Sequence, residues 1–271
     1  MTVGNGQKTP ETLTRLLTAV VLLPALAIVY YGGIIAVALY LLVTSLMAAE
    51  AIRVRGVKTA SLQGIVVIAA VELPAVNLAM GALISPLVSV IAAAVVLIGV
   101  SISRNSSMSR NSSWISAAIL VALMLTCYSF VGLTLAGSQH WMLLLVATVI
   151  ATDTAAFFGG RFFGGPKLAP MISPSKTWSG AIAGLIGGGL LAALIAPSLG
   201  ISLQSGVIMG ILIADFSIGG DLLESWFKRQ HSVKDSGRIL PGHGGLLDRC
   251  DGYLLSAPLV YCVVILGGIN G

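Results

Sequence analysis

Long apolar runs follow one another along almost the whole chain, and only short polar connections separate them. A helix needs about twenty apolar residues to cross the hydrocarbon core of a bilayer. Only helices and closed barrels can span that core, because every backbone polar group must find a partner within the protein. The sequence therefore predicts an all-α, polytopic integral membrane bundle of about nine transmembrane helices, near 16–31, 34–52, 62–80, 82–102, 115–136, 141–158, 179–199, 203–227 and 252–269.

The composition supports this interpretation. Charged residues make up 9% of the chain and hydrophobic residues 56%, whereas a soluble domain carries about 25% charged residues. We expect a single membrane domain over 1–271, in which 1–140 forms N-terminal helices and 141–271 carries the catalytic helices and the cytoplasmic loops. Cys127, Cys250 and Cys262 are too scattered for a disulfide framework or a thiolate metal site.

The basic residues are confined to one side of the predicted membrane. All fifteen lysines and arginines lie before the first run or in the connections after the second, fourth, sixth and eighth runs. Positively charged connections stay in the cytoplasm, so we expect a cytoplasmic N-terminus. The net charge of +5 then belongs to the membrane edges and does not indicate nucleic-acid binding. The first run also resembles a secretory signal, but the eight runs after it favour a first membrane span.

One polar stretch, 225–251, stands out near the end of the chain. It reads SWFKRQHSVKDSGRILPGHGGLLDRCD and holds five of the fifteen basic residues. Ionisable groups are costly next to apolar spans and usually mark a functional site. We interpret this stretch as the working face of a membrane enzyme.

Carboxylates converge on the same region. Asp221 and Glu224 are three residues apart near the end of the eighth run, as are Asp248 and Asp251 before the ninth. Residues three apart on a helix share a face, so the four could meet at one depth and hold Mg²⁺ together with phosphate oxygens. The alternative is a salt-bridge network that locks the helix ends, or charges that simply reach for the interface.

Other features inside the runs have simpler interpretations. Asp215 is six residues before Asp221 and so points to a different helix face, and both Glu72 and Asp215 are interpreted as structural or supporting groups. Gly180, Gly184 and Gly188 recur every four residues, and such a stripe lets another membrane helix pack closely.

A second polar stretch, 161–178, follows the sixth run and is predicted to be a loop because it is rich in glycine and proline. Ser173 and Pro174 are typical of an N-cap and a first helical residue. A helix start beside Lys176 could bind phosphate, although Ser-Pro also simply begins helices. In the turn 241–245, His243 could contact a phosphate or cap the ninth helix.

These residues resemble the signature of the phosphatidate cytidylyltransferases, also called CDP-diacylglycerol synthases. The shared pattern runs through Ser225, Phe227, Lys228, Arg229, Lys234, Asp235, Gly237, Leu240, Pro241, His243, Gly244, Gly245, Leu246, Asp248, Arg249 and Asp251 with fixed gaps. The segments 153–161 (DTAAFFGGR), 173–180 (SPSKTWSG) and 220–225 (GDLLES) are similar to other family motifs. The sequence departs from the family at Ser175, usually Lys, at Ser179, usually Glu, and at Cys250, usually aliphatic.

The resemblance implies transfer of the cytidylyl group of CTP to phosphatidate. It implies Mg²⁺ at Asp221 and Asp248, near Glu224 and Asp251, and leaves room for a second, monovalent cation such as K⁺. Lys234 and Arg249 would assist catalysis with Asp221 and Asp248. Substrate-binding residues would be Asp153, Arg161, Ser173, Lys176, Thr177, Ser225, Lys228, Arg229, Asp235, His243 and Gly244.

The resemblance also implies a homodimer, and it places the protein in a bacterial inner membrane with its active site facing the cytoplasm. Three alternatives remain. A CTP-dependent polyprenol or phytol kinase would transfer the γ-phosphate, and a CDP-archaeol-type synthase would differ only in the lipid. A transporter would place its charges near the midplane and often show inverted repeats.

Overall fold

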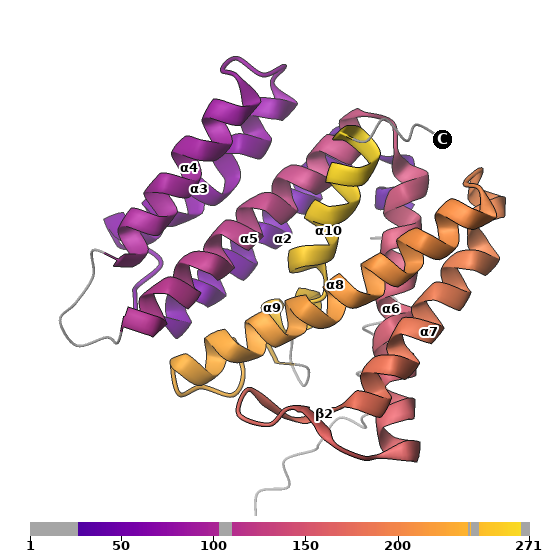
Figure 1. Cartoon of the computed structure of the whole chain (residues 1–271). Helices are drawn as coiled ribbons and strands as arrows, with labels where there is room; N and C mark the ends of the chain where they lie inside the picture. The colour runs from indigo at the N-terminus through magenta and orange to yellow at the C-terminus, as the bar shows by residue number, and fades with distance from the viewer. Residues whose placement is uncertain (1–26, 103–109, 238, 240–243, 267–271) are drawn as a thin grey trace, which may run out of the picture.

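The described part of the chain is almost entirely helical. The computed structural model describes residues 27–102, 110–237, 239 and 244–266. Its elements are α2 (Gly33–Val54), α3 (Leu62–Ala79), α4 (Pro86–Ile102), α5 (Arg110–Leu135), α6 (Gln139–Phe163), β1 (Lys167–Ala169), β2 (Ser173–Thr177), α7 (Trp178–Ile195), η1 (Ala196–Leu199), α8 (Leu203–Gln230), α9 (Leu247–Cys250), α10 (Tyr253–Tyr261) and η2 (Cys262–Leu266) (Figure 1).

Six of these helices are long and apolar enough to cross a membrane, and two shorter helices, Pro86–Ile102 and Tyr253–Ile265, are apolar as well. The prediction of an all-α, polytopic membrane protein is therefore confirmed. Most of the first predicted run lies outside the described residues, so the count of nine stays a prediction. α4 begins at Pro86 rather than near 82, because the Asn77 side chain bonds both the N–H and the C=O of Ile84 and holds the preceding connection out of the helix.

Two groups of helices form the bundle. α5 packs against α2, α3 and α4, α7 packs against α6 and α8, and α10 contacts both α5 and α8. Fully buried side chains such as Leu120 and Trp141 fill the contacts within the bundle. Other large apolar side chains, including Ile91 and Leu194, are exposed, which is typical of helices whose outer surface faces lipid.

Glycines bring α6 and α7 close together. A Cβ on Gly180 would lie 2.9 Å from the carbonyl oxygen of Ala156, and a Cβ on Gly188 would lie 2.5 Å from Oγ1 of Thr152. Gly184 meets the same helix between them. Small residues at this spacing allow membrane helices to approach, so the predicted packing stripe is confirmed.

The connection between α6 and α7 differs from its prediction. Residues predicted to be a loop form an antiparallel hairpin of β1 and β2. The prediction that Ser173 caps a helix beginning at Pro174 is wrong, because both residues belong to β2, whose backbone pairs with β1. Helix α7 begins at Trp178, and the side chain of Thr177 caps it by accepting a hydrogen bond from the N–H of Gly180 at 3.1 Å.

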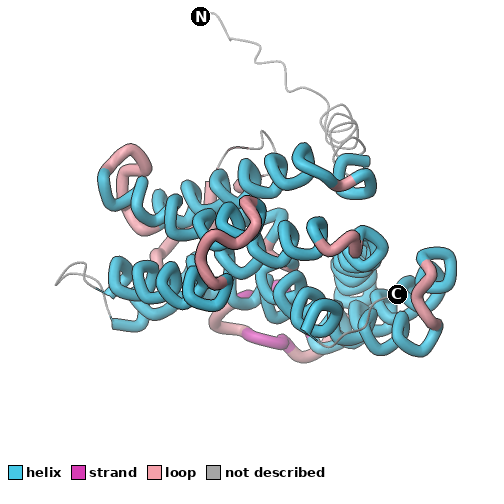
Figure 2. Tube along the Cα trace, turned by 90° about the horizontal axis from the view of Figure 1, so that it is seen from above, coloured by secondary structure: helices cyan, strands magenta, loops and turns pink. Residues whose placement is uncertain are grey.

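The elements that carry the polar stretches gather at one end of the bundle. The C-terminal end of α6, the hairpin, the start of α7, the end of α8 and α9 all lie toward the lower side of Figure 1. Seen from above, the hairpin lies at the edge of the helices (Figure 2). The next element, α10, returns into the bundle against α5 and α8. Segments that are far apart in the sequence therefore share one end of the molecule.

Candidate active site

Three carboxylates form a cluster where α8 meets the end of α9. Asp221 and Glu224 come from α8, and Asp251 follows the last residue of α9. One carboxylate oxygen of each lies within 4.8 Å of the others. A Cβ on Gly220 would lie 2.4 Å from the carbonyl oxygen of Asp251, so a glycine is needed for the two segments to approach. We call these three residues the carboxylate cluster.

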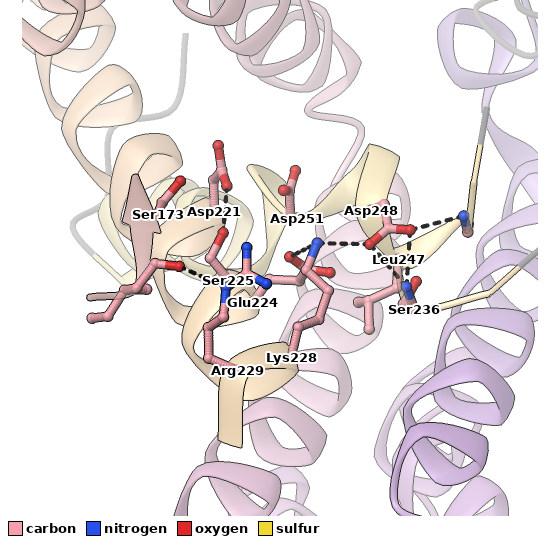
Figure 3. Close-up of polar contacts among 12 residues, drawn as sticks. Ser173, Asp221, Glu224, Ser225, Lys228, Arg229, Ser236, Leu247, Asp248 and Asp251 are labelled. Atoms are coloured by element: carbon pink, nitrogen blue, oxygen red, sulfur yellow. Dashed lines mark hydrogen bonds and ion pairs between the residues drawn. The ribbon is translucent and has the colours of Figure 1, made fainter. Parts of the chain in front are cut away.

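Asp221 is the member of the cluster with the most polar contacts. Lys176, reaching across from β2, forms an ion pair with its Oδ2. Ser225, one turn later on α8, donates a hydrogen bond to its Oδ1 at 3.3 Å (Figure 3). The hairpin and α8 thus meet at this carboxylate.

Asp248 lies beside the cluster and has its own set of partners. Its carboxylate accepts hydrogen bonds from the N–H of Ser236 at 3.0 and 3.1 Å, from the N–H of Gly245 at 2.8 Å and from Lys228 at 2.8 Å (Figure 3). Burial raises the pKa of Asp248, but hydrogen bonds with Glu224 and Lys228 outweigh it and lower the pKa to about 2. Asp248 is therefore ionised at neutral pH.

Lys228 joins Asp248 to the cluster, because its Nζ also lies 2.7 Å from Oε2 of Glu224. Glu224 is fully buried, and Lys228 is the described cation that lies next to its carboxyl group. Burial raises the pKa of Asp251, and the nearby charges of Asp221 and Asp153 raise it further. Buried carboxylates with so few donors are costly, and oxygen ligands of this kind suit a divalent cation.

A cavity of about 510 Å³ opens beside the cluster. Five predicted site residues line it, namely Asp153, Arg161, Lys176, Thr177 and Asp221. They come from α6, the hairpin and α8, so tertiary packing brings them together. Two cations and the N-terminal end of α7 at the wall of one cavity suit the binding of phosphate groups.

A second cavity, of about 390 Å³, adjoins the first, since Leu168, Ala181 and Ile218 line both. Its remaining wall is mostly apolar and consists of Trp178, Ile182, Leu185, Asp215, Phe216, Gly219, Leu222 and Leu255. Asp215, predicted to point away from the carboxylate cluster, is exposed here on α8. We call this space the apolar cavity.

Two predicted residues lie at the hairpin, and one of them ties it to α8. Arg229 donates from Nε to the carbonyl oxygen of Ile172 at 3.2 Å and so ties α8 to the turn of the hairpin. Ser173 is buried, 3.5 Å from the hydroxyl of Ser175. At the departure Ser179, the hydroxyl donates to the carbonyl oxygen of Gly164 and closes the base of the same hairpin.

The structure does not bring every predicted residue into the site. Lys234, Asp235 and Arg249 are exposed, and neither Lys234 nor Asp235 bonds to a described residue. His243 lies outside the described residues. Gly244 does border the site, because a Cβ placed on it would lie 3.1 Å from Oδ2 of Asp248, and its φ of +85° favours glycine.

Sequence reasoning missed Glu50 of α2. Its Oε2 accepts hydrogen bonds from the N–H of Leu247 at 2.8 Å and from the hydroxyl of Ser236 at 3.3 Å. The available signal was a lone acid near the end of an apolar run, followed by Arg53 and Arg55. Nothing in that signal identifies its partners, which lie almost two hundred residues later in the chain.

Glu72 has a structural environment, as predicted. Thr44 and Ser45 of α2 donate hydrogen bonds to its Oε1 at 2.8 and 3.2 Å, and the thiol of Cys127 on α5 donates to its Oε2 at 3.3 Å. This carboxylate therefore links α2, α3 and α5, at a place that shares no residue with the carboxylate cluster.

Comparisons with known proteins agree with the geometry. Residues 13–266 match the family model described as "Cytidylyltransferase family". The chain is 52% identical to the phosphatidate cytidylyltransferase of Brucella suis biovar 1 (strain 1330) over 124 residues. These residues make up 44% of this chain and 45% of the relative. It is 46% identical over 143 residues to phosphatidate cytidylyltransferase 5, chloroplastic, of Arabidopsis thaliana, over 50% of this chain and 36% of the relative.

A third relative, the phosphatidate cytidylyltransferase of Rickettsia bellii (strain RML369-C), is 40% identical over 134 residues, which make up 46% of this chain and 58% of the relative. The matched part of the chain thus spans about half the length, or less, of the Brucella and Arabidopsis proteins.

Proposed function

Because the chain belongs to the cytidylyltransferase family, we propose that it transfers the cytidylyl group of CTP to phosphatidate and forms CDP-diacylglycerol and pyrophosphate. The substrates are those of its relatives, which are named phosphatidate cytidylyltransferases. The observation that carries the proposal is the carboxylate cluster beside a cavity whose wall holds Arg161 and Lys176.

The residues present fit a divalent cation. Asp221, Glu224 and Asp251 each offer a carboxylate oxygen within 4.8 Å of the others, and Asp248 lies beside them through Lys228. We propose that Asp221, with these neighbours, holds Mg²⁺, which would supply positive charge to the phosphate oxygens of the substrates. A second, monovalent cation is a further expectation from the family.

The chain's own residues must bring two anions together. A phosphate oxygen of phosphatidate attacks the α-phosphorus of CTP, a new P–O bond forms, and the bond from that phosphorus to pyrophosphate breaks. The attacking oxygen is already an anion, so no strong general base is needed. Lys176 and Arg161 at the cavity wall would screen the repulsion between the phosphates and the charge that builds up on the leaving group.

The apolar cavity supports a lipid as the second substrate. It adjoins the phosphate-binding cavity, and Ile182, Leu185, Phe216 and Leu222 line it. We propose that an acyl chain of phosphatidate occupies it while the lipid phosphate faces Asp221. Burial of methylene groups stabilises such binding by about 0.8 kcal/mol each.

The orientation that we propose for the protein in the membrane is based on its basic residues. We propose that the charged end of the bundle faces the cytoplasm of a bacterial inner membrane, since CTP is a cytosolic nucleotide and the lysines and arginines lie on that side. A homodimer is a further proposal, based on the family resemblance alone.

The decisive experiment uses radiolabelled CTP with phosphatidate in detergent micelles, with and without Mg²⁺. Label should enter the lipid from α-labelled CTP only, and only when Mg²⁺ is present. Entry of label from γ-labelled CTP would identify a lipid kinase instead. Transfer from neither position would favour the transporter.

A further inference from the structure

A buried carboxylate of the N-terminal helices holds the segment that presents Asp248. Glu50 lies on α2, four residues before its end, and is 0% exposed. Its Oε2 accepts the N–H of Leu247 at 2.8 Å and the hydroxyl of Ser236 at 3.3 Å. A buried carboxylate is costly unless donors meet it, and here both donors come from the two ends of one segment of the polar stretch.

Asp248 accepts hydrogen bonds from the same segment. Its carboxylate accepts the N–H of Ser236 and the N–H of Gly245, and Figure 3 shows Ser236 and Leu247 next to Asp248. Ser236 therefore donates its backbone N–H to one carboxylate and its hydroxyl to the other. Leu247, bound to Glu50 through its N–H, is the residue directly before Asp248.

The local backbone is shaped to fit Glu50. A Cβ on Gly237 would lie 2.1 Å from Oε1 of Glu50, and a Cβ on Gly245 would lie 2.8 Å from its Oε2. A side chain at either position would displace the carboxylate from its place. Gly237 and Gly245 thus allow this contact with α2.

We propose that Glu50 is a positioning residue, which holds Ser236 and Leu247 so that Asp248 and Lys228 stay beside the carboxylate cluster. Glu50 does not line the cavity that holds Arg161 and Lys176, so it acts through other residues. Its effect on turnover rests on the proposed function, whereas its effect on the segment does not.

The test combines kinetics with hydrogen exchange of the full chain in detergent micelles. Glu50→Ala leaves the N–H of Leu247 and the hydroxyl of Ser236 without their acceptor. We expect faster exchange in peptides from 231–251 only, and a fall in kcat of about 10- to 100-fold with a smaller change in KM for CTP. Glu50→Gln should retain more activity than Glu50→Ala, because its amide oxygen can still accept from Leu247.

Glu72→Ala is the matched control, because Glu72 is a carboxylate of the same region that bonds to Thr44, Ser45 and Cys127 instead. In the Glu72→Ala variant, hydrogen exchange over 231–251 and turnover should stay as in the unmodified protein. If Glu50→Ala fails to fold, Ser236→Ala removes one donor from the same contact and should give the same local exchange.

The proposal would be overturned if hydrogen exchange over 231–251 stays unchanged in the variants that remove this contact. It would also be overturned if hydrogen exchange rises equally in α6 and α7. Local exchange with unaltered kcat would overturn it as well. If the unmodified protein transfers no cytidylyl group, the proposed function fails, and the exchange pattern still decides whether Glu50 holds the segment.

Discussion

Single residues in the site differ in how their charges are balanced. Asp221 is paired with Lys176, and Asp248 has one lysine and two backbone amides. Glu224, by contrast, is fully buried among other carboxyl groups, and among the described residues Lys228 is the cation next to it. A site with more carboxylate than cation attracts positive charge, and the residues that supply this excess are the first to test by substitution.

The variants Asp221→Asn and Asp248→Asn should each lose turnover by about 100- to 1,000-fold. The amide keeps the shape of the carboxylate and removes the charge that would hold the cation and orient Lys176 or Lys228. Label transfer from α-labelled CTP measures the loss, and gel filtration in detergent checks the fold. Lys58→Gln is the control, because Lys58 is exposed in the connection between α2 and α3 and should leave turnover unchanged. Near-normal activity of either Asn variant would remove that residue from the metal assignment.

Cation binding should strengthen as the pH rises. Burial raises the pKa of Asp251 above its ordinary range, and the charges of Asp221 and Asp153 add to this. Below that raised pKa a proton occupies the carboxyl group and competes with the cation, and above it the competition ends. Titration with Mn²⁺ at several pH values should show that the affinity for the cation increases with pH, and Asp251→Asn should weaken this pH dependence. If Asp251→Asn leaves the pH dependence of the Mn²⁺ affinity unaltered, the competing proton belongs to another group.

At the level of elements, the hairpin and α7 determine the shape of the site. β2 carries Lys176 to Asp221, and Arg229 of α8 anchors the hairpin turn. The glycines of α7 let it approach α6, so that Asp153 and Arg161 line the same cavity as Lys176. Residues of α7 also line the apolar cavity. One helix therefore contributes to both the charged and the apolar part of the site.

Leu185→Trp should raise the KM for long-chain phosphatidate several-fold and affect a short-chain analogue less. The larger ring fills part of the apolar cavity, and each displaced methylene group costs about 0.8 kcal/mol of binding. Initial rates with the two lipids at fixed CTP measure the difference. Ile186→Trp is the control, since Ile186 is exposed on α7 and lines neither cavity. Equal effects of both substitutions, or equal effects on both lipids, would exclude the apolar cavity as the acyl site.

Across the whole molecule, the site depends on contacts between distant parts of the chain. The 1–140 region contributes Glu50, which bonds to the segment before Asp248, while α6, the hairpin and α8 supply the cavity. α10 contacts both α5 and α8 and so joins the two groups of helices. The charged residues end up at one end of the bundle, which suits an enzyme that meets a lipid and a water-soluble nucleotide at the same interface.

Single cysteines introduced into a cysteine-free variant should report the orientation in the membrane. Lys58 and Lys234 are exposed on connections predicted to be cytoplasmic, and Ser198 is exposed on a connection predicted to lie outside. A membrane-impermeant thiol reagent added to intact cells should label Ser198→Cys, and Lys58→Cys and Lys234→Cys should react only after the cells are opened. The reverse pattern would overturn the predicted orientation.

The sequence alone was sufficient for the helices and for part of the site. Membrane helices must satisfy their backbone internally, so hydropathy and length predict them directly, and each of the second to ninth predicted spans coincides with a described helix. The three-residue spacing of Asp221 and Glu224 likewise predicted a shared face, because helix geometry is local. The glycine stripe of α7 was recognisable for the same reason.

Only the tertiary structure decided the contacts between segments. The hairpin replaced the predicted helix start at Ser173 because β1 supplies its backbone partners. Asp248 lies beside the cluster rather than in it because Ser236, Gly245 and Lys228 bind its carboxylate. Glu50 gained its role because α2 packs next to α9. Each of these outcomes depends on which donors meet in space, and hydropathy and spacing within one segment carry no information about that.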